Sequence, residues 1–262
     1  MVVPSTGLEH DDARMSLMEH LTELRDRIIK IVLAVAVGMV LSFLLYNRIF
    51  EFLLRPYDEI ANAKTSLTGG KLLQTDPLEG FGIRMKLALY GGIGIAMPVI
   101  LWQIWRFVTP GLYAKEKRLA IPFMVSALLL FVLGAGLAYY TLPRALDFLI
   151  SIGGEENFVT AFAPTKYFTL ITYMMLAFGI GFEFPILLIF LQMAGVITVA
   201  NLRAWRRYAV VGICVLVAVI TPSGDPISML MLSVPMVLFY EIAIIVGWLM
   251  ARRKRRAAAA PT

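Results

Sequence analysis

Two glutamates that lie inside long apolar stretches stand out as residues that could do chemistry. Glu183 is followed closely by Pro185, and Glu241 lies in the last apolar stretch. A charged side chain inside a bilayer costs roughly 2.5–3.5 kcal/mol, so it usually faces a cavity or a polar partner. Pro185 also leaves a backbone carbonyl without its donor and kinks a helix at the same depth. These residues predict a polar notch at Glu183, with a hydrogen bond to a neighbouring helix as the alternative. For Glu241, nearer the end of its stretch, that hydrogen bond is the preferred interpretation.

Two further glutamates flank the apolar stretches. Glu23 lies just before the first stretch, where an i,i+4 ion pair with Arg27 is its simplest role. Glu116 lies between the second and third stretches, where an acid favours the first turn of the following helix. Its basic neighbours keep its carboxylate ionised but repel an incoming cation; they are Lys115, Lys117 and Arg118. The residues alone therefore leave open whether these two acids bind a cation.

The sequence lacks the common signatures of enzymes. It contains no GxxxxGK[ST] phosphate-binding loop and no HExxH zinc motif, and both histidines, His10 and His20, precede the first apolar stretch. The single cysteine, Cys214, is expected to be a core thiol. Gly91–Gly94 lies within an apolar stretch and predicts close helix packing. We therefore predict a protein that is not an enzyme and that uses no cofactor, metal ion or nucleic acid.

The composition is that of a membrane protein. Hydrophobic residues make up 59% of the 262 positions, charged residues make up 16%, and the mean hydropathy is +0.78. A bilayer core about 30 Å thick needs roughly 20 apolar residues as helix, because every backbone polar group must be bonded internally. We predict an all-α integral membrane protein, a single polytopic domain over residues 1–262 with six transmembrane helices at about 28–46, 85–105, 121–142, 167–193, 208–220 and 227–248.

The basic residues are divided unequally between the two sides of the predicted spans. The side that holds both termini carries 16 of the 24 lysines and arginines, and the other side carries 8. The positive-inside rule therefore places both termini in the cytoplasm and the chain in the cell inner membrane. Residues 1–27 form an amphipathic cytoplasmic segment that leads into the first span, and residues 249–262 form a basic cytoplasmic tail. No cleaved signal peptide is expected.

The outer, periplasmic side has two long loops, 47–84 and 143–166. Each contains an apolar piece that is expected to form a short helix and to cap the spans: Ile49–Leu54 in the first loop and Ala145–Ile150 in the second. The fifth span has only 13 residues, which is about 20 Å of helix. The turn at 221–226 follows it and predicts a close hairpin of the fifth and sixth spans.

Four motifs follow one another along the chain, at His20–Arg27, Pro98–Tyr113, Phe178–Pro185 and Thr221 with Asp225, and together they resemble those of the TatC family of twin-arginine protein translocases. His20–Arg27 is similar to the family's HLxELRxR motif, and Phe178–Pro185 is similar to its FGxxFExP motif. Pro98–Tyr113, followed by an acid and two basic residues, resembles the family's second helix and first cytoplasmic loop. Thr221 and Asp225 resemble its last outer turn. The resemblance covers the chain from about residue 16 to about residue 250.

The resemblance implies a translocase core subunit that binds the twin-arginine signal peptides of folded precursor proteins. It also implies recruitment of single-span partners of the TatA and TatB types, transport driven by the proton-motive force, and a homo-oligomer within a larger complex in the lipid bilayer. The residues assigned to signal-peptide binding are Glu23, Leu24, Arg25, Phe107, Pro110 and Glu116. Glu183 matches the family's intramembrane glutamate, and Thr221 and Asp225 are assigned to partner contact. Two carboxylates suit two arginines because a guanidinium fork pairs bidentately with a carboxylate.

Two other classes of function fit part of the pattern. An ion-coupled secondary transporter of a small solute is the main alternative. It is disfavoured because the sequence has neither an internal repeat nor two broken helices at matching positions. A structural assembly factor for other membrane proteins is the second alternative, and it would not bind peptides that carry consecutive arginines.

Overall fold

The structure is a computed structural model that describes residues 17–64, 72, 76–108, 120–153, 163–221 and 224–258. These residues form eight α-helices and no strand, which confirms the all-α prediction for the described part of the chain. The helices are α1 (Leu17–Leu44), α2 (Tyr46–Lys64), α3 (Glu79–Val108), α4 (Ala120–Gly153), α5 (Pro164–Gly181), α6 (Phe184–Met193), α7 (Val199–Ile220) and α8 (Pro226–Ala258).

Five helical stretches are long and apolar enough to cross a membrane: Met18–Leu44, Glu79–Phe107, Ile121–Ile152, Pro164–Met193 and Pro226–Arg252. The fourth of them combines α5 and α6. The helix α7 is not among the five because its first half carries three arginines, at positions 203, 206 and 207. The predicted short span at 208–220 is thus the apolar second part of a 22-residue helix. The count of six spans stays a prediction.

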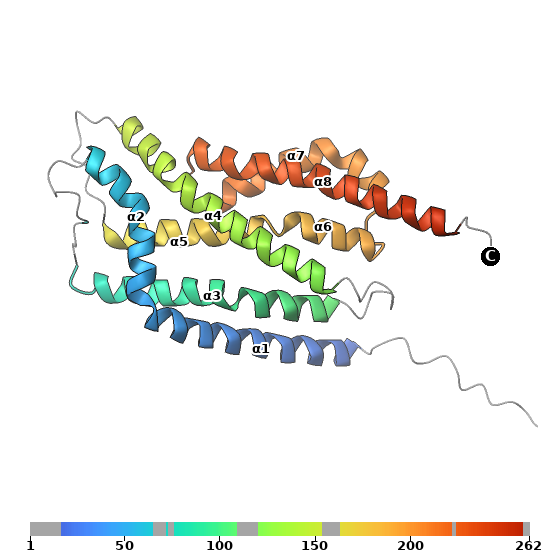
Figure 1. Ribbon diagram of the computed structural model, residues 1–262, viewed down its shortest axis with the longest axis horizontal. Helices are drawn as coiled ribbons and strands as arrows, with labels where there is room; N and C mark the ends of the chain where they lie inside the picture. Colours follow the sequence, from blue (N-terminus) through green and yellow to red (C-terminus); the bar gives the residue numbers. More distant parts are fainter. Residues whose placement is uncertain are drawn as a thin grey trace, which may run out of the picture.

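The helices form an elongated bundle with two distinct ends (Figure 1). At one end, here called the proximal end, α1 and α7 begin and α3 and α8 end (Figure 1). The helix α2 crosses the opposite, distal end. Along the bundle, α1 lies against α3, α4 packs on α5, and α7 packs against α8. The close hairpin predicted for the last two apolar stretches is therefore confirmed, and the first and last described residues lie at the same end.

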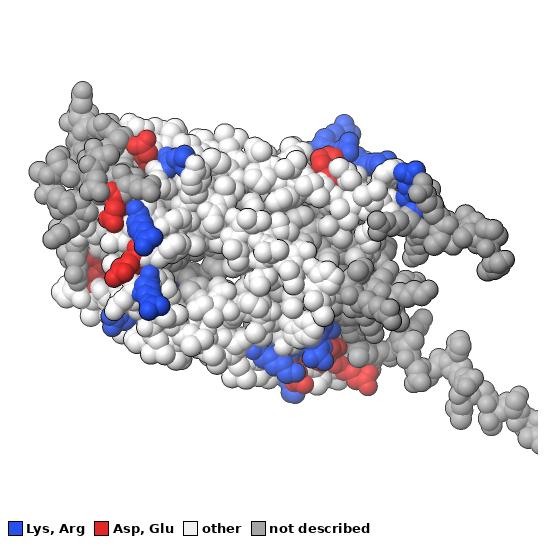
Figure 2. Space-filling model, viewed as in Figure 1, with Lys and Arg blue, Asp and Glu red and all other residues white. Residues whose placement is uncertain are grey.

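Charged side chains gather at the two ends of the bundle and leave an apolar belt between them (Figure 2). Large apolar side chains of this belt face outward, as Leu133 and Val219 do with 61% and 77% exposure. Cys214 is also exposed, so its prediction as a core thiol is wrong. The reason is that α7 buries a stripe through Ile213 and Val217, and Cys214 lies beside that stripe.

The helix α2 caps the distal ends of α4 and α5 (Figure 1). The ring of Phe50 stacks on that of Phe168 in α5, with centroids 4.6 Å apart. The Tyr167 hydroxyl of α5 donates a hydrogen bond of 2.7 Å to the Leu53 carbonyl. The capping helix predicted at Ile49–Leu54 is therefore confirmed, as part of a longer helix.

The second predicted capping helix is wrong. Ala145–Ile150 does not form a separate helix but continues α4, which runs through Pro143. A proline inside a helix removes one backbone hydrogen bond and usually ends or kinks the helix. Here Leu142 and Leu146, on either side of Pro143, are 0% and 3% exposed, so the packed face of α4 extends past the proline. Burial of this face outweighs the local break.

Close backbone contact joins α1 to α3. A Cβ atom at Gly38 would collide with the carbonyl oxygen of Gly92, and a Cβ at Gly92 would lie 2.6 Å from a backbone nitrogen of α1. The Ser42 hydroxyl donates to the Leu87 carbonyl of α3 at 2.9 Å. The packing role predicted for Gly91–Gly94 is confirmed at Gly92. These contacts hold α1 and α3 in a defined register.

Candidate functional site

The proximal ends of α1 and α3 bring an acid, an arginine and an amide together. Glu23 and Arg27 lie one turn apart on α1, and the Arg27 guanidinium forms an ion pair with the Glu23 carboxylate. Arg27 also donates to Gln103 Oε1 of α3 at 3.3 Å. The i,i+4 pair predicted from spacing is confirmed. Sequence reasoning missed Gln103, although an amide within an apolar stretch was a signal that could have identified it.

Both charged groups of this pair are largely covered. The Glu23 side chain is 19% exposed and the Arg27 side chain is 12% exposed. Glu23 Oε1 faces Arg27, whereas Glu23 Oε2 is buried and has no hydrogen-bond partner among the described residues. A carboxylate offers about four lone-pair sites, so Oε2 is available to a second donor. The arrangement is chemically suited to bind another guanidinium or ammonium group.

An aromatic pair lies next to this acid. The rings of His20 on α1 and Phe107 on α3 are stacked, with centroids 4.6 Å apart and planes at 21°. Because His20 precedes Glu23 by three residues, the two lie on one face of α1, and Phe107 is beside that face. Two predicted members of this site, Pro110 and Glu116, lie outside the described residues.

Two neighbours on α1 are oriented differently. Leu24 is half-buried, and the Arg25 side chain is 71% exposed. Arg25 forms an ion pair of 3.3 Å with Asp26. Residues two positions apart do not share a helix face, so Arg25 does not join the pair that Glu23 forms with Arg27. The structure thus brings Phe107 toward Glu23 and turns Arg25 away.

Glu183 lies at a break between two helices. The helix α5 ends at Gly181, α6 begins at Phe184, and Glu183 is the N-cap residue of α6 with Pro185 in the first turn. Pro185 has no N–H to donate to the carbonyl of Gly181, which explains the interruption. The predicted kink is confirmed. Glu183 Oε1 is buried and has no hydrogen-bond partner in the described part of the chain. What this carboxylate binds stays a prediction.

The other intramembrane glutamate has a partner on the neighbouring helix. Glu241 of α8 pairs with Arg206 of α7 across 2.7 Å, and both side chains are about half exposed. The preferred interpretation of Glu241 as a residue bonded to a neighbouring helix is therefore confirmed. The pair links α7 and α8 near the proximal end.

The turn between α7 and α8 contains the two residues assigned to partner contact. Thr221 and Asp225 are only 4% and 2% exposed. Asp225 Oδ1 accepts a hydrogen bond of 2.7 Å from the Ser228 N–H and so caps α8, while Gly224, with φ of +60°, closes the turn. Both assigned side chains are thus buried within the hairpin, where they shape its turn.

Comparison with known proteins provides the family. The model of the family Sec-independent protein translocase protein (TatC) matches residues 19–235. TatC of Frankia casuarinae is 40% identical over 252 residues, which cover 94% of this chain and 69% of that protein. TatC of Aquifex aeolicus is 39% identical over 247 residues, which cover 92% and 98%.

A solved structure agrees with the sequence relatives. The crystal structure of a twin arginine translocase receptor, TatC, is 39% identical and superposes with a TM-score of 0.73, covering 88% of this chain and 99% of that chain. Protein translocation, not solute transport, is the process that these relatives share. The chain therefore belongs to the TatC family and is a multi-pass component of a protein translocase in the cytoplasmic membrane, not an enzyme.

Proposed function

We propose that the chain is the receptor core that binds the twin-arginine signal peptides of folded precursor proteins at the proximal end of α1 and α3. The observation that supports this best is the Glu23 carboxylate. One of its oxygens is held by Arg27, and the other is buried with no partner among the described residues. An arginine of the signal peptide would complete the bonding of this second oxygen.

The chemistry of arginine fits such a site. A guanidinium is planar, stays charged, and pairs with carboxylates through two parallel hydrogen bonds. Arg27 divides its hydrogen bonds between Glu23 and Gln103. This division favours acceptance of a second guanidinium by the Glu23 carboxylate. Glu116 is the second acid of the proposal, because the twin-arginine motif carries two positive charges and would then meet one carboxylate for each arginine. Phe107 supplies an aromatic ring beside the site, and Pro110 follows it by three positions in the sequence.

The proposed orientation places the proximal end in the cytoplasm. In this orientation the chain has six spans, of which α7 is the fifth, and both termini lie in the cytoplasm. The excess of lysines and arginines on the side of the termini supports it through the positive-inside rule. With this orientation, α2 faces the periplasm, and signal peptides reach Glu23 from the compartment in which precursors fold.

Transport itself requires partners. We propose that the chain works with single-span subunits of the TatA and TatB types and forms a homo-oligomer within a larger complex. Its energy source is the proton-motive force. Glu183, at the break between α5 and α6, is the proposed polar contact inside the membrane. Because Thr221 and Asp225 are buried, they would act on a partner by setting the shape of the α7–α8 hairpin.

Photocrosslinking to a twin-arginine signal peptide tests the receptor role. Replacing Glu23 by glutamine removes the charge but keeps the volume, and we expect at least about a tenfold loss of crosslinked product, because a hydrogen bond to a charged group contributes about 1.5–3 kcal/mol. Alanine at both Glu23 and Glu116 should abolish the product. A twin-lysine peptide should crosslink more weakly than the twin-arginine peptide to the unchanged chain.

Asp26→Ala is the matched control. Asp26 is an acid on the same helix, three residues from Glu23, and its side chain is 52% exposed. We expect its replacement to leave crosslinking unchanged. Undiminished crosslinking after replacement of both Glu23 and Glu116, or an equal loss in Asp26→Ala, would refute the proposed site.

A further inference from the structure

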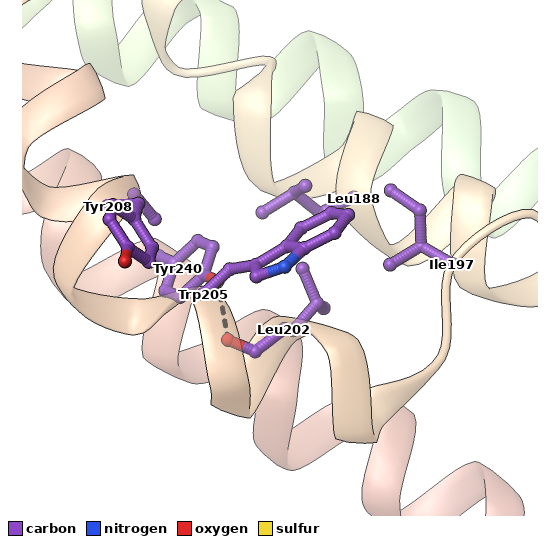
Figure 3. Close-up of a pocket in the computed structure, with 7 residues that line it drawn as sticks. Leu188, Ile197, Leu202, Trp205, Tyr208 and Tyr240 are labelled. Atoms are coloured by element: carbon purple, nitrogen blue, oxygen red, sulfur yellow. Dashed lines mark hydrogen bonds between the residues drawn. The ribbon is translucent and has the colours of Figure 1, made fainter.

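A pocket opens at the proximal end of the α7–α8 hairpin, away from the Glu23 site. Its volume is 460 Å³, within the range of ligand sites. Figure 3 shows the Trp205 indole lying across it, with Leu188 and Ile197 on one side and Leu202 on the other. The Tyr240 hydroxyl at its wall already donates to the Leu202 carbonyl at 2.7 Å. The lining is therefore mainly aliphatic and aromatic, and the Tyr240 hydroxyl has its hydrogen bond within the fold.

Two arginines on the same half of α7 as this pocket lack an acidic partner in the described part of the chain. Arg203, Arg206 and Arg207 are all exposed on the first half of α7. Arg206 is engaged by Glu241 at 2.7 Å. Neither Arg203 nor Arg207 has a carboxylate within ion-pair distance among the described residues. Figure 2 shows this basic cluster at the end of the bundle where α7 begins and α8 ends.

The rim of the pocket links one of these arginines to the apolar interior. The Arg207 guanidinium lies 4.9 Å from the centroid of the Tyr208 ring, and Tyr208 lines the pocket. Trp205 and Tyr208 are 52% and 64% exposed, as aromatic residues of a membrane interface are. No charged residue follows Arg207 in α7, so the pocket lies where the apolar belt meets the charged end.

We propose that this pocket binds an anionic phospholipid, with an acyl chain against Leu188, Ile197 and Leu202 and the phosphate on Arg203 and Arg207. The two positive charges favour an anionic lipid over a zwitterionic one, because the headgroup of a zwitterionic lipid would bring its own cation to the two arginines. Arginines also match phosphate oxygens through bidentate hydrogen bonds. The lipid would hold the α7–α8 hairpin against the end of α6. The site is separate from the signal-peptide site and does not depend on it.

Native mass spectrometry of the purified full-length chain tests the proposal. Phosphatidylglycerol or phosphatidylethanolamine is titrated into the delipidated protein in detergent. We expect one tightly held phosphatidylglycerol per chain and weaker binding of phosphatidylethanolamine. Each arginine near a membrane surface contributes about 1 kcal/mol, so Arg203→Gln with Arg207→Gln should weaken phosphatidylglycerol binding by about thirtyfold.

Two further variants separate the pocket from general surface charge. Ala209→Leu fills the pocket without changing charge and should weaken binding by at least about tenfold, because Ala209 lines it. Ala218→Leu, at an exposed position of the same helix, is its control. Arg252→Gln with Arg253→Gln removes two charges from the same end of the bundle. Both controls should bind phosphatidylglycerol within about twofold of the unchanged chain.

Three results would overturn the proposal. The first is equal affinity for phosphatidylglycerol and phosphatidylethanolamine. The second is unchanged binding in Ala209→Leu, or losses in the two controls as large as those in the pocket variants. The third is a photocrosslinker at Trp205 that captures the transmembrane helix of a single-span protein and is not displaced by phosphatidylglycerol. In that case the pocket is a protein contact.

Discussion

Replacing Gly38 by alanine tests how tightly α1 is held against α3. A Cβ atom at this position would collide with the carbonyl oxygen of Gly92 and lie 3.1 Å and 3.2 Å from its carbonyl carbon and Cα. All three are backbone atoms, which cannot rotate away as a side chain does. The added methyl group therefore forces the two helices apart where they touch, and this separation should also loosen the contact between Arg27 and Gln103 three turns away.

The magnitude follows from two opposing effects. Overpacking of a close contact usually costs about 1–3 kcal/mol. Alanine has a higher helix propensity than glycine, which returns up to about 1 kcal/mol. The contact with Gly92 involves backbone on both sides and leaves no cheap adjustment, so the cost should exceed the gain. We expect the free energy of unfolding to fall by about 1–2 kcal/mol.

Unfolding of the purified chain in mixed micelles with increasing sodium dodecyl sulfate measures this loss. Gly94→Ala is the matched control, because Gly94 lies two residues from Gly92 on α3 and a Cβ there would meet no atom within 4 Å beyond its chain neighbours and the backbone of its own helix. Its stability should be unchanged or slightly raised. If Gly38→Ala unfolds at the same detergent concentration as Gly94→Ala, the packing reasoning is refuted and α1 is not in close backbone contact with α3.

The remaining predictions concern single hydrogen bonds between elements and use the same titration. Ser42→Ala removes the hydroxyl donor between α1 and α3 and should cost about 0.6 kcal/mol, the average for such bonds in membranes. Ser126→Ala, which loses only a bond within its own helix, should cost less, and equal losses would contradict the assignment. Glu79→Ala removes the side chain that accepts from the Thr165 N–H at 2.9 Å, and should cost about 1 kcal/mol as a lost helix cap. Hydrogen exchange at the start of α5 should rise in Glu79→Ala but not in Glu51→Ala, and a rise in both would count against a capping role.

The contacts between α1 and α3 explain how an acid can be covered at the edge of the bundle. Glu23 lies near the start of α1, where a side chain would ordinarily be solvated. The glycine contact between Gly38 and Gly92 lets the helices approach, and this approach brings Gln103 within reach of Arg27. The polar site thus depends on packing three turns away along α1.

Local features of the sequence determined much of this protein. Apolar length and the need to satisfy backbone hydrogen bonds predict membrane helices, because both depend only on neighbouring residues. The missing N–H of Pro185 predicted the break beside Glu183, and the spacing of Glu23 and Arg27 predicted their ion pair, since each effect acts within one helical turn. The four ordered motifs pointed to the family that the comparisons show.

Only the tertiary structure decided which distant residues meet and which local rules hold. Gln103 meets Arg27 across 76 positions because α1 packs on α3, a contact that no local pattern contains. The continuation of α4 through Pro143, the burial of Asp225 and the exposure of Cys214 also differ from simple expectation. In each case the neighbours of the residue, and not its type, set its environment, because burial is a property of the packed helices together.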